Sequence, residues 1–246
     1  MLFPLGDDNS GRQTTPYVVY GLIALNVLIF LIQMTVGDPF TNGWSTVPYE
    51  ITHHMDLVGV QTIHVGAQTA RIPLYPGPTP IYLTLLSSMF MHGSLMHIGG
   101  NMLYLWIFGD QIEDLIGHGK FLAFYLLCGF AADFAQIVVD PDSKIPSLGA
   151  SGAIAGVLGA YLIKYPRNNV RVFVMRFLTT MPAYIVLGLW IVLQIVSQMT
   201  IPADEAGGGG VAYMAHIGGF VTGVVLVFLF GGGRRVAAGA GPLSGR

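Results

Sequence analysis

Six long apolar segments constrain the fold of this 246-residue chain more than any other feature. They span residues 17–36, roughly 81–108, 121–139, 151–165, a stretch within 181–196, and 211–230. Most approach the ~20 residues that a helix needs to cross a bilayer. Only 10% of the residues are charged, whereas soluble domains average about 25%. The pattern predicts an all-α polytopic membrane protein, with six transmembrane helices, a long outer first loop and a short central fourth helix.

The positions of the basic residues predict how the chain is oriented. Cytoplasmic loops of membrane proteins are enriched in Lys and Arg. If the N-terminus is cytoplasmic, nine of the eleven basic residues lie inside: Arg12, Lys120, Lys164, Arg167, Arg171, Arg176, Arg234, Arg235 and Arg246. Only Arg71 and Lys144 then lie outside. Both termini are therefore expected in the cytoplasm. No basic stripe indicates binding to nucleic acid.

Three regions flank or interrupt the apolar segments. Residues 1–16 are expected to form a cytoplasmic N-terminal segment, and residues 232–246 a flexible, Gly/Ala/Arg-rich cytoplasmic tail. Residues 37–80 are too long and too apolar for a plain linker. They are expected either to lie in the membrane interface or to cover the outer mouth of the bundle.

A serine at the start of the short fourth segment is the first sign of chemistry. Ser151 lies in the sequence Gly-Ala-Ser-Gly. A helix over residues 151–165 is about 22 Å long, whereas the hydrocarbon core is about 30 Å thick. Ser151 is therefore expected about 8 Å below the outer boundary. His216, five residues into the sixth segment, reaches the same depth. Polar residues at such depth are candidates for function.

The residue types at this depth are those that acyl transfer requires. Serine becomes a nucleophile when a base, usually histidine, takes its proton. The oxyanion that forms needs donors arranged beforehand. Asn101 and His97 are four residues apart and therefore share one helical face. The backbone N–H of Ser151, at the start of its helix, adds a third donor.

Glycines at four-residue spacing indicate how the serine and histidine helices approach each other. Small residues at this interval let membrane helices pack closely. Gly152 and Gly156 follow Ser151, and Gly219 and Gly223 follow His216. A hydrogen bond between Ser151 and His216 needs such close packing.

Together these motifs make the chain resemble the rhomboid family of intramembrane serine proteases over nearly its whole length. The matching segments are HGSLMHIGGN, with His92, His97 and Asn101, GASG at Ser151, and AHIGG at His216. The opening FPLGDDN also resembles bacterial members.

The resemblance implies a protease domain over residues 17–231 in the bacterial inner (plasma) membrane. It implies a Ser151–His216 catalytic dyad working through an acyl-enzyme. The oxyanion donors would be His97, Asn101 and the Ser151 N–H. Supporting roles fall to His92, Gly149, Gly152 and Gly219. The implied substrate is a transmembrane protein that enters laterally from the lipid bilayer, and no cofactor or metal is implied.

Three departures from the family pattern are visible. Some members carry Trp-Arg in the first loop, and this chain does not. Some carry an aromatic residue four positions after the serine, where it braces the base, and here that residue is Ala155. Asp133, in the third segment, either orients a histidine as in a triad or is a buried acid bonded to Gln136 or a loop amide.

Three other functions stay open. The first is a six-span transporter or channel, which the clustering of histidines toward one side and the lack of an inverted repeat disfavour. The second is a metalloprotease, which the number of histidines suggests (His53, His54, His64, His92 and His97), but no His-Glu-x-x-His motif is present. The third is a non-catalytic rhomboid-like binding protein, which the intact Ser151 and His216 disfavour. The fifth segment and residues 203–210 are candidate substrate gates.

Overall fold

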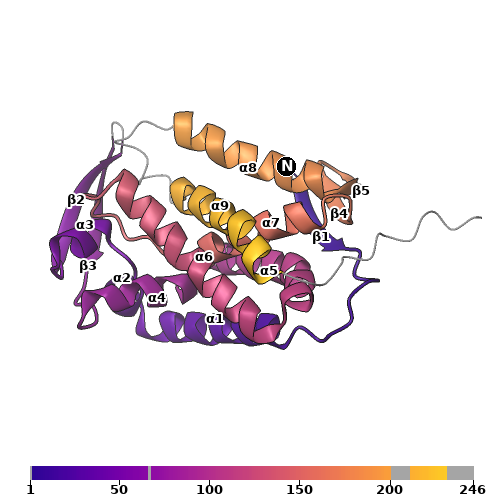
Figure 1. The fold of residues 1–246 in the computed structure, drawn as a ribbon. Coiled ribbons are helices and arrows are strands. Elements are labelled where there is room, and N and C mark those ends of the chain that lie inside the picture. Colours follow the sequence, from indigo (N-terminus) through magenta and orange to yellow (C-terminus); the bar gives the residue numbers. More distant parts are fainter. Residues whose placement is uncertain (1, 66–67, 201–210, 232–246) are drawn as a thin grey trace, which may run out of the picture.

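The computed structural model describes residues 2–65, 68–200 and 211–231, and helices dominate it (Figure 1). The strands are β1 (Leu2–Asp7), β2 (Gly59–Val65), β3 (Gln68–Leu74), β4 (Asn169–Val174) and β5 (Phe177–Pro182). The longer helices are α1 (Tyr17–Val36), α5 (Leu95–Ile116), α6 (His118–Val139), α7 (Ser151–Lys164), α8 (Ala183–Thr200) and α9 (Tyr213–Phe230). The short ones are α2 (Asp38–Gly43), α3 (Pro48–His53) and α4 (Thr84–Ser87), with 3-10 turns at Ile81–Leu83 and Ser88–Phe90.

The predicted helical membrane architecture is confirmed. Among the described residues, four helices are long and apolar enough to cross a membrane, namely α1, α6, α8 and α9. The other two predicted segments correspond to α5 and α7. Neither is a span candidate by these criteria, because α5 carries three acidic residues in its last two turns and α7 has only 14 residues. Buried side chains of α5, α6, α7 and α9 form the core between these helices.

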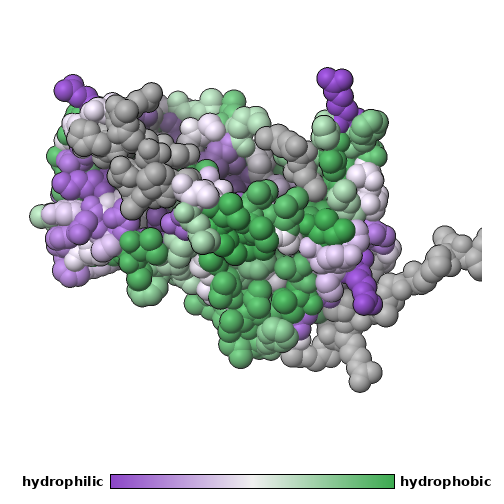
Figure 2. Space-filling view, turned by 90° about the horizontal axis from the view of Figure 1, so that it is seen from above, coloured by the Kyte–Doolittle hydropathy of each residue, from purple (hydrophilic) through white to green (hydrophobic). Residues whose placement is uncertain are grey.

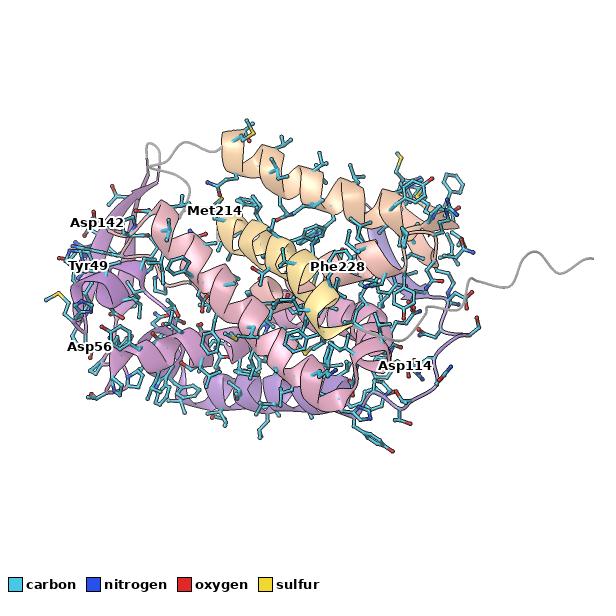
Figure 3. The ribbon with its side chains drawn as sticks, viewed as in Figure 1. Tyr49, Asp56, Asp114, Asp142, Met214 and Phe228 are labelled. Carbon is cyan, nitrogen blue, oxygen red and sulfur yellow. The ribbon has the colours of Figure 1, made fainter. Side chains whose placement is uncertain are left out.

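Hydrophobic and hydrophilic side chains separate along the molecule. In Figure 2, hydrophobic residues gather over the middle of the face shown and hydrophilic ones lie toward its two ends. Figure 3 places Asp56 and Asp142 at one end of the molecule and Asp114 at the other. We call the first the loop end, because it carries residues 37–80, and the second the sheet end, because it carries β1, β4 and β5 (Figure 1). This banding is what a bilayer requires of a spanning protein.

The second apolar segment is not one continuous helix over residues 81–108, as its hydropathy predicted. The chain turns through two short 3-10 turns and α4, becomes extended at Met91, and begins α5 only at Leu95. The break ends at Ser94, the N-cap of α5, whose side chain accepts a hydrogen bond from the backbone N–H of His97. Hydropathy alone misses such a break because the residues on both sides of it are equally apolar.

Three strands at the sheet end were not expected from an all-helical pattern. β1 pairs antiparallel with β4, and β4 pairs with β5. Val170 and Val172 of β4 are fully buried while their neighbours in the strand are exposed. β1 and β4 are separated by more than 160 residues, and such long-range pairing leaves little signal in a local sequence window.

The long first loop is folded and fastened to the loop end of the bundle. Thr46 and Ser147 exchange two backbone hydrogen bonds, of 3.0 and 2.7 Å. The Thr46 hydroxyl also donates to the carbonyl of Thr84 at 2.9 Å. The loop thereby holds the segment that leads into α7.

Glycines bring α7 and α9 into backbone contact, as their spacing predicted. A methyl group added at Gly219 would lie 2.0 Å from the carbonyl oxygen of Gly152. One added at Gly223 would lie 1.9 Å from the carbonyl oxygen of Gly156. No side chain fits between the two helices at these positions.

We therefore expect Gly223→Ala to force α7 and α9 apart. Overpacking of this kind costs about 1–3 kcal/mol of folding free energy. Thermal unfolding in detergent measures the loss. Gly188→Ala on α8 is the control, because nothing lies within 4 Å of a methyl group added there. Equal unfolding temperatures for the two variants would contradict the close contact.

A buried carboxyl group connects the sheet to the bundle. The hydroxyl of Tyr161 donates to Asp7 Oδ2 at 2.5 Å, and Gln111 Nε2 donates to the same oxygen at 2.9 Å. Burial disfavours the charged form and raises the pKa of Asp7 from 3.8 to about 7. The folded protein therefore holds a proton that the unfolded chain releases at lower pH.

This raised pKa predicts a pH-dependent stability. Between pH of about 4 and 7 the folded state binds more protons at Asp7 than the unfolded state, so the free energy of unfolding falls as pH rises. Asp7→Asn should make the free energy of unfolding depend less on pH over this range. Unfolding temperatures of wild type and Asp7→Asn at pH 5 and pH 8 measure it. Burial also raises the pKa of Glu50 to about 7, but Glu50 is the same in both proteins. An equal change in unfolding temperature between pH 5 and pH 8 in wild type and Asp7→Asn would therefore contradict the assignment of this effect to Asp7.

Candidate active site

Ser151 and His216, predicted from separate segments, lie within hydrogen-bond distance of each other. Ser151 is the first residue of α7, and His216 lies in the first turns of α9. His216 Nε2 is 2.8 Å from Ser151 Oγ. Figure 3 labels Met214, two residues before His216, at the end of α9 that faces the loop end. The pair therefore lies toward that end of the bundle.

His97 and Asn101 flank the serine from α5. A methyl group added at Gly149 would lie 2.8 Å from His97 Nε2 and 3.6 Å from Asn101 Nδ2. Gly149, two residues before Ser151, has φ of +124°, which an L side chain rarely adopts. The chain needs glycine here both for its backbone conformation and for the space that the two side chains occupy.

Hydrogen bonds fix which atoms these two side chains present. His97 Nδ1 accepts the backbone N–H of Gly93 at 3.3 Å, so a neutral His97 carries its proton on Nε2, beside Gly149. Asn101 Nδ2 donates to His92 Nε2 at 2.9 Å, and His92 is 2% exposed. The Asn101 amide has a second N–H, so the bond to His92 holds the amide in place and leaves one of its two donors available.

Two residues of α8 that the sequence reasoning missed contact the histidine. Gln194 Oε1 accepts a hydrogen bond from His216 Nδ1 at 2.7 Å. The Trp190 ring lies 5.7 Å from the imidazole, centroid to centroid, at 38°. The sequence shows only that Trp190 and Gln194 are four residues apart in an apolar helix and so share one face; it does not show which helix that face meets. His216 is therefore contacted from α8, whereas Ala155 of α7 has no aromatic ring and lies buried in the core.

Asp133 is not placed as the third member of a triad. Its Oδ2 accepts the Ser88 hydroxyl at 3.4 Å, while the Nδ1 position of His216 is taken by Gln194. Of the two readings open for Asp133, the buried acid fits the geometry, with Ser88 as partner in place of Gln136 or a loop amide.

A cavity of about 570 Å³ joins these groups. Its lining includes Ser151, His216, His97, Asn101 and Trp190. A smaller cavity of about 210 Å³ adjoins it at the loop end and shares Gly93 and His97 with it. The site thus has both a space for a substrate and a second, partly polar space beside it.

The other predicted residues fall into three groups. Gly152 and Gly219 lie at the α7–α9 contact described above. His53 and His54 lie at the loop end, where His53 Nε2 is 3.7 Å from Asp142 and His54 contacts the Tyr82 hydroxyl. They are therefore apart from Ser151. Residues 203–210, a candidate gate, and the tail 232–246 lie outside the described residues.

Comparison with known proteins places this arrangement in a family. The family model for the Rhomboid domain matches residues 80–233. "RHOMBOID-like protein 4" of Arabidopsis thaliana is 28% identical over 228 residues, which cover 89% of this chain and 53% of that protein. "Rhomboid protein 1, mitochondrial" of Saccharomyces cerevisiae is 29% identical over 147 residues, covering 58% and 40%. "Rhomboid protease GluP" of Bacillus subtilis is 36% identical over 105 residues, covering 43% and 20%.

The matched region holds every residue that lines the cavity, from Met89 to His216. It also covers more than half of the chain, although the chain spans only about half or less of these relatives' lengths. The chain therefore belongs to the rhomboid family.

Proposed function

We propose that this protein is an intramembrane serine endopeptidase that hydrolyses peptide bonds in or near transmembrane segments. Family membership supports a protease of this type. The single observation that carries the proposal is the distance of 2.8 Å between Ser151 Oγ and His216 Nε2. A serine hydroxyl bonded to an imidazole nitrogen is the arrangement that nucleophilic catalysis needs.

In the first step, Ser151 Oγ attacks the carbonyl carbon of the scissile peptide bond while His216 Nε2 takes the hydroxyl proton. The bond from carbonyl carbon to nitrogen then breaks, and the imidazolium gives its proton to the leaving amine. An acyl-enzyme on Ser151 remains. Water, activated by the same histidine, hydrolyses it and restores the serine.

The negative charge that forms on the carbonyl oxygen needs donors in fixed positions. His97 Nε2–H and the second N–H of Asn101 lie beside Gly149, and the backbone N–H of Ser151 begins α7. The proposed oxyanion site consists of these three donors. The N-terminus of α7 adds a favourable dipole, because no side chain caps its first turn.

The substrate proposal rests on where the site lies. Ser151 and His216 are enclosed by helices that include membrane-span candidates. A peptide bond reaches them only if a transmembrane segment enters from the lipid and unwinds locally, since an intact helix keeps its backbone groups bonded. We propose transmembrane proteins as substrates and residues 17–231 as the catalytic unit. The smaller cavity beside His97 offers a place for the hydrolytic water.

We further propose a plasma (inner) membrane location with both termini cytoplasmic. The distribution of Lys and Arg supports this orientation. The name of the yeast relative assigns that protein to mitochondria, whereas "Rhomboid protease GluP" comes from a bacterium.

A serine-directed fluorophosphonate probe tests the nucleophile. Wild type should be labelled, Ser151→Ala should not, and His216→Ala should react at least about 100-fold more slowly, because a general base contributes 10²–10⁴-fold. The measurement is the labelling rate of purified protein, followed by cleavage of a reconstituted transmembrane substrate.

Ser197→Ala on α8 is the matched control and should label like wild type. Metal chelators should leave cleavage unchanged. Labelling retained in Ser151→Ala would remove the nucleophile assignment. A wild type that neither labels nor cleaves would favour the non-catalytic binding protein.

Asp133→Asn should leave the labelling rate within about twofold of wild type, because a side chain outside the reacting network contributes little to the barrier. The structure places this carboxyl against Ser88. The same probe assay measures the rate, with unfolding temperature as a check on folding. A loss comparable to that of His216→Ala would restore Asp133 as a triad member.

A further inference from the structure

Gln194 is a polar side chain in the middle of an apolar helix. α8 is a membrane-span candidate with a mean hydropathy of 1.7. Polar groups in such surroundings are costly unless they find a hydrogen-bond partner. Gln194 is half-buried and turned inward, and its partner is the ring of His216. In Figure 1, α8 and α9 lie side by side, as this contact requires.

The orientation of the Gln194 amide determines where the proton of His216 lies. Gln194 Nε2 donates to the carbonyl oxygen of Trp190 at 3.5 Å, which turns Oε1 toward the imidazole. An amide oxygen only accepts, so the bond of 2.7 Å needs a proton on His216 Nδ1. The neutral imidazole then has its lone pair on Nε2, facing Ser151 Oγ at 2.8 Å. This is the tautomer that accepts the serine proton.

We propose that Gln194 is a positioning residue that holds His216 in its reactive tautomer and orientation. This inference rests on the proposed function, since it concerns the base of that reaction. Gln194 takes the place that a carboxylate occupies in a Ser-His-Asp triad, but it is neutral. It fixes the tautomer and also accepts a hydrogen bond from the imidazolium when that cation forms.

Trp190 completes the arrangement one turn earlier on the same helix. Its ring lies against His216 and also stacks on Phe220 of α9, 6.3 Å between centroids. The imidazole thus has two contacts from α8, a hydrogen bond to Gln194 and a tilted ring contact with Trp190. Without an aromatic side chain at Ala155, α7 supplies no such support.

Spectroscopy and kinetics on matched variants test the proposal. Gln194→Met keeps the length of the side chain but removes the acceptor, and Gln194→Glu keeps an acceptor at the same reach. Gln198→Met, one turn further along α8, is the control. The other titratable groups lining the cavity, His97 and Tyr104 on α5 and Asp133 on α6, are unchanged throughout. The probe is the serine-directed fluorophosphonate used above.

In ¹⁵N-histidine NMR spectra at pH 8, assigned with His216→Ala, wild type should show the Nδ1–H tautomer of His216. Gln194→Met should show a mixture of tautomers. Its labelling rate should fall on the order of 10- to 100-fold, the scale of a misplaced catalytic group. With a transmembrane substrate, the fall should appear in kcat with KM nearly unchanged. Gln194→Glu should restore both tautomer and rate.

Unchanged tautomer and rate in Gln194→Met would overturn the proposal, as would an equal loss in Gln198→Met. If Gln194→Met unfolds, the Gln194→Glu protein alone decides, because loss of the Nδ1–H signal in that variant contradicts the bond. Labelling retained in Ser151→Ala would instead refute the proposed function and leave the NMR result on His216 standing.

Discussion

The backbone contact between α7 and α9 is the constraint on which the site depends. Gly152 and Gly156 face Gly219 and Gly223 so closely that no Cβ atom fits between them. A wider separation would carry His216 away from Ser151, because neither side chain is long enough to bridge a larger distance between the helices. In lipid, apolar surfaces gain little from facing each other, so close packing of small residues is what brings such helices together.

Around that contact, the polar groups form a connected set inside an apolar bundle. Gln194 accepts from His216, and His216 meets Ser151. At α5, the Asn101 side chain donates a hydrogen bond to His92, and the backbone N–H of Gly93 donates one to His97. Four elements, α5, α7, α8 and α9, each contribute at least one member. Each of these side chains has at least one hydrogen-bond partner, and the order that this gives is what catalysis by fixed donors requires.

Much of this architecture was predictable from local pattern. Hydropathy located all six helical segments, with α1 matching over residues 17–36 and α7 beginning at Ser151. It failed at residues 91–94, where the chain becomes extended before Ser94 caps the start of α5, because the apolar residues on both sides of these four positions hide the break. It also missed the sheet, because β1 and its partner β4 are more than 160 residues apart in the sequence.

The sequence by itself determined which residues are candidates for chemistry and which helices can pack closely, because residue type and four-residue spacing are local properties. Only the tertiary structure decided what His216 touches besides Ser151. Trp190 and Gln194 lie more than twenty positions before it, and nothing in their spacing points to His216. Their role follows from how α8 lies against α9, and such contacts between distant segments depend on the packing of the whole bundle.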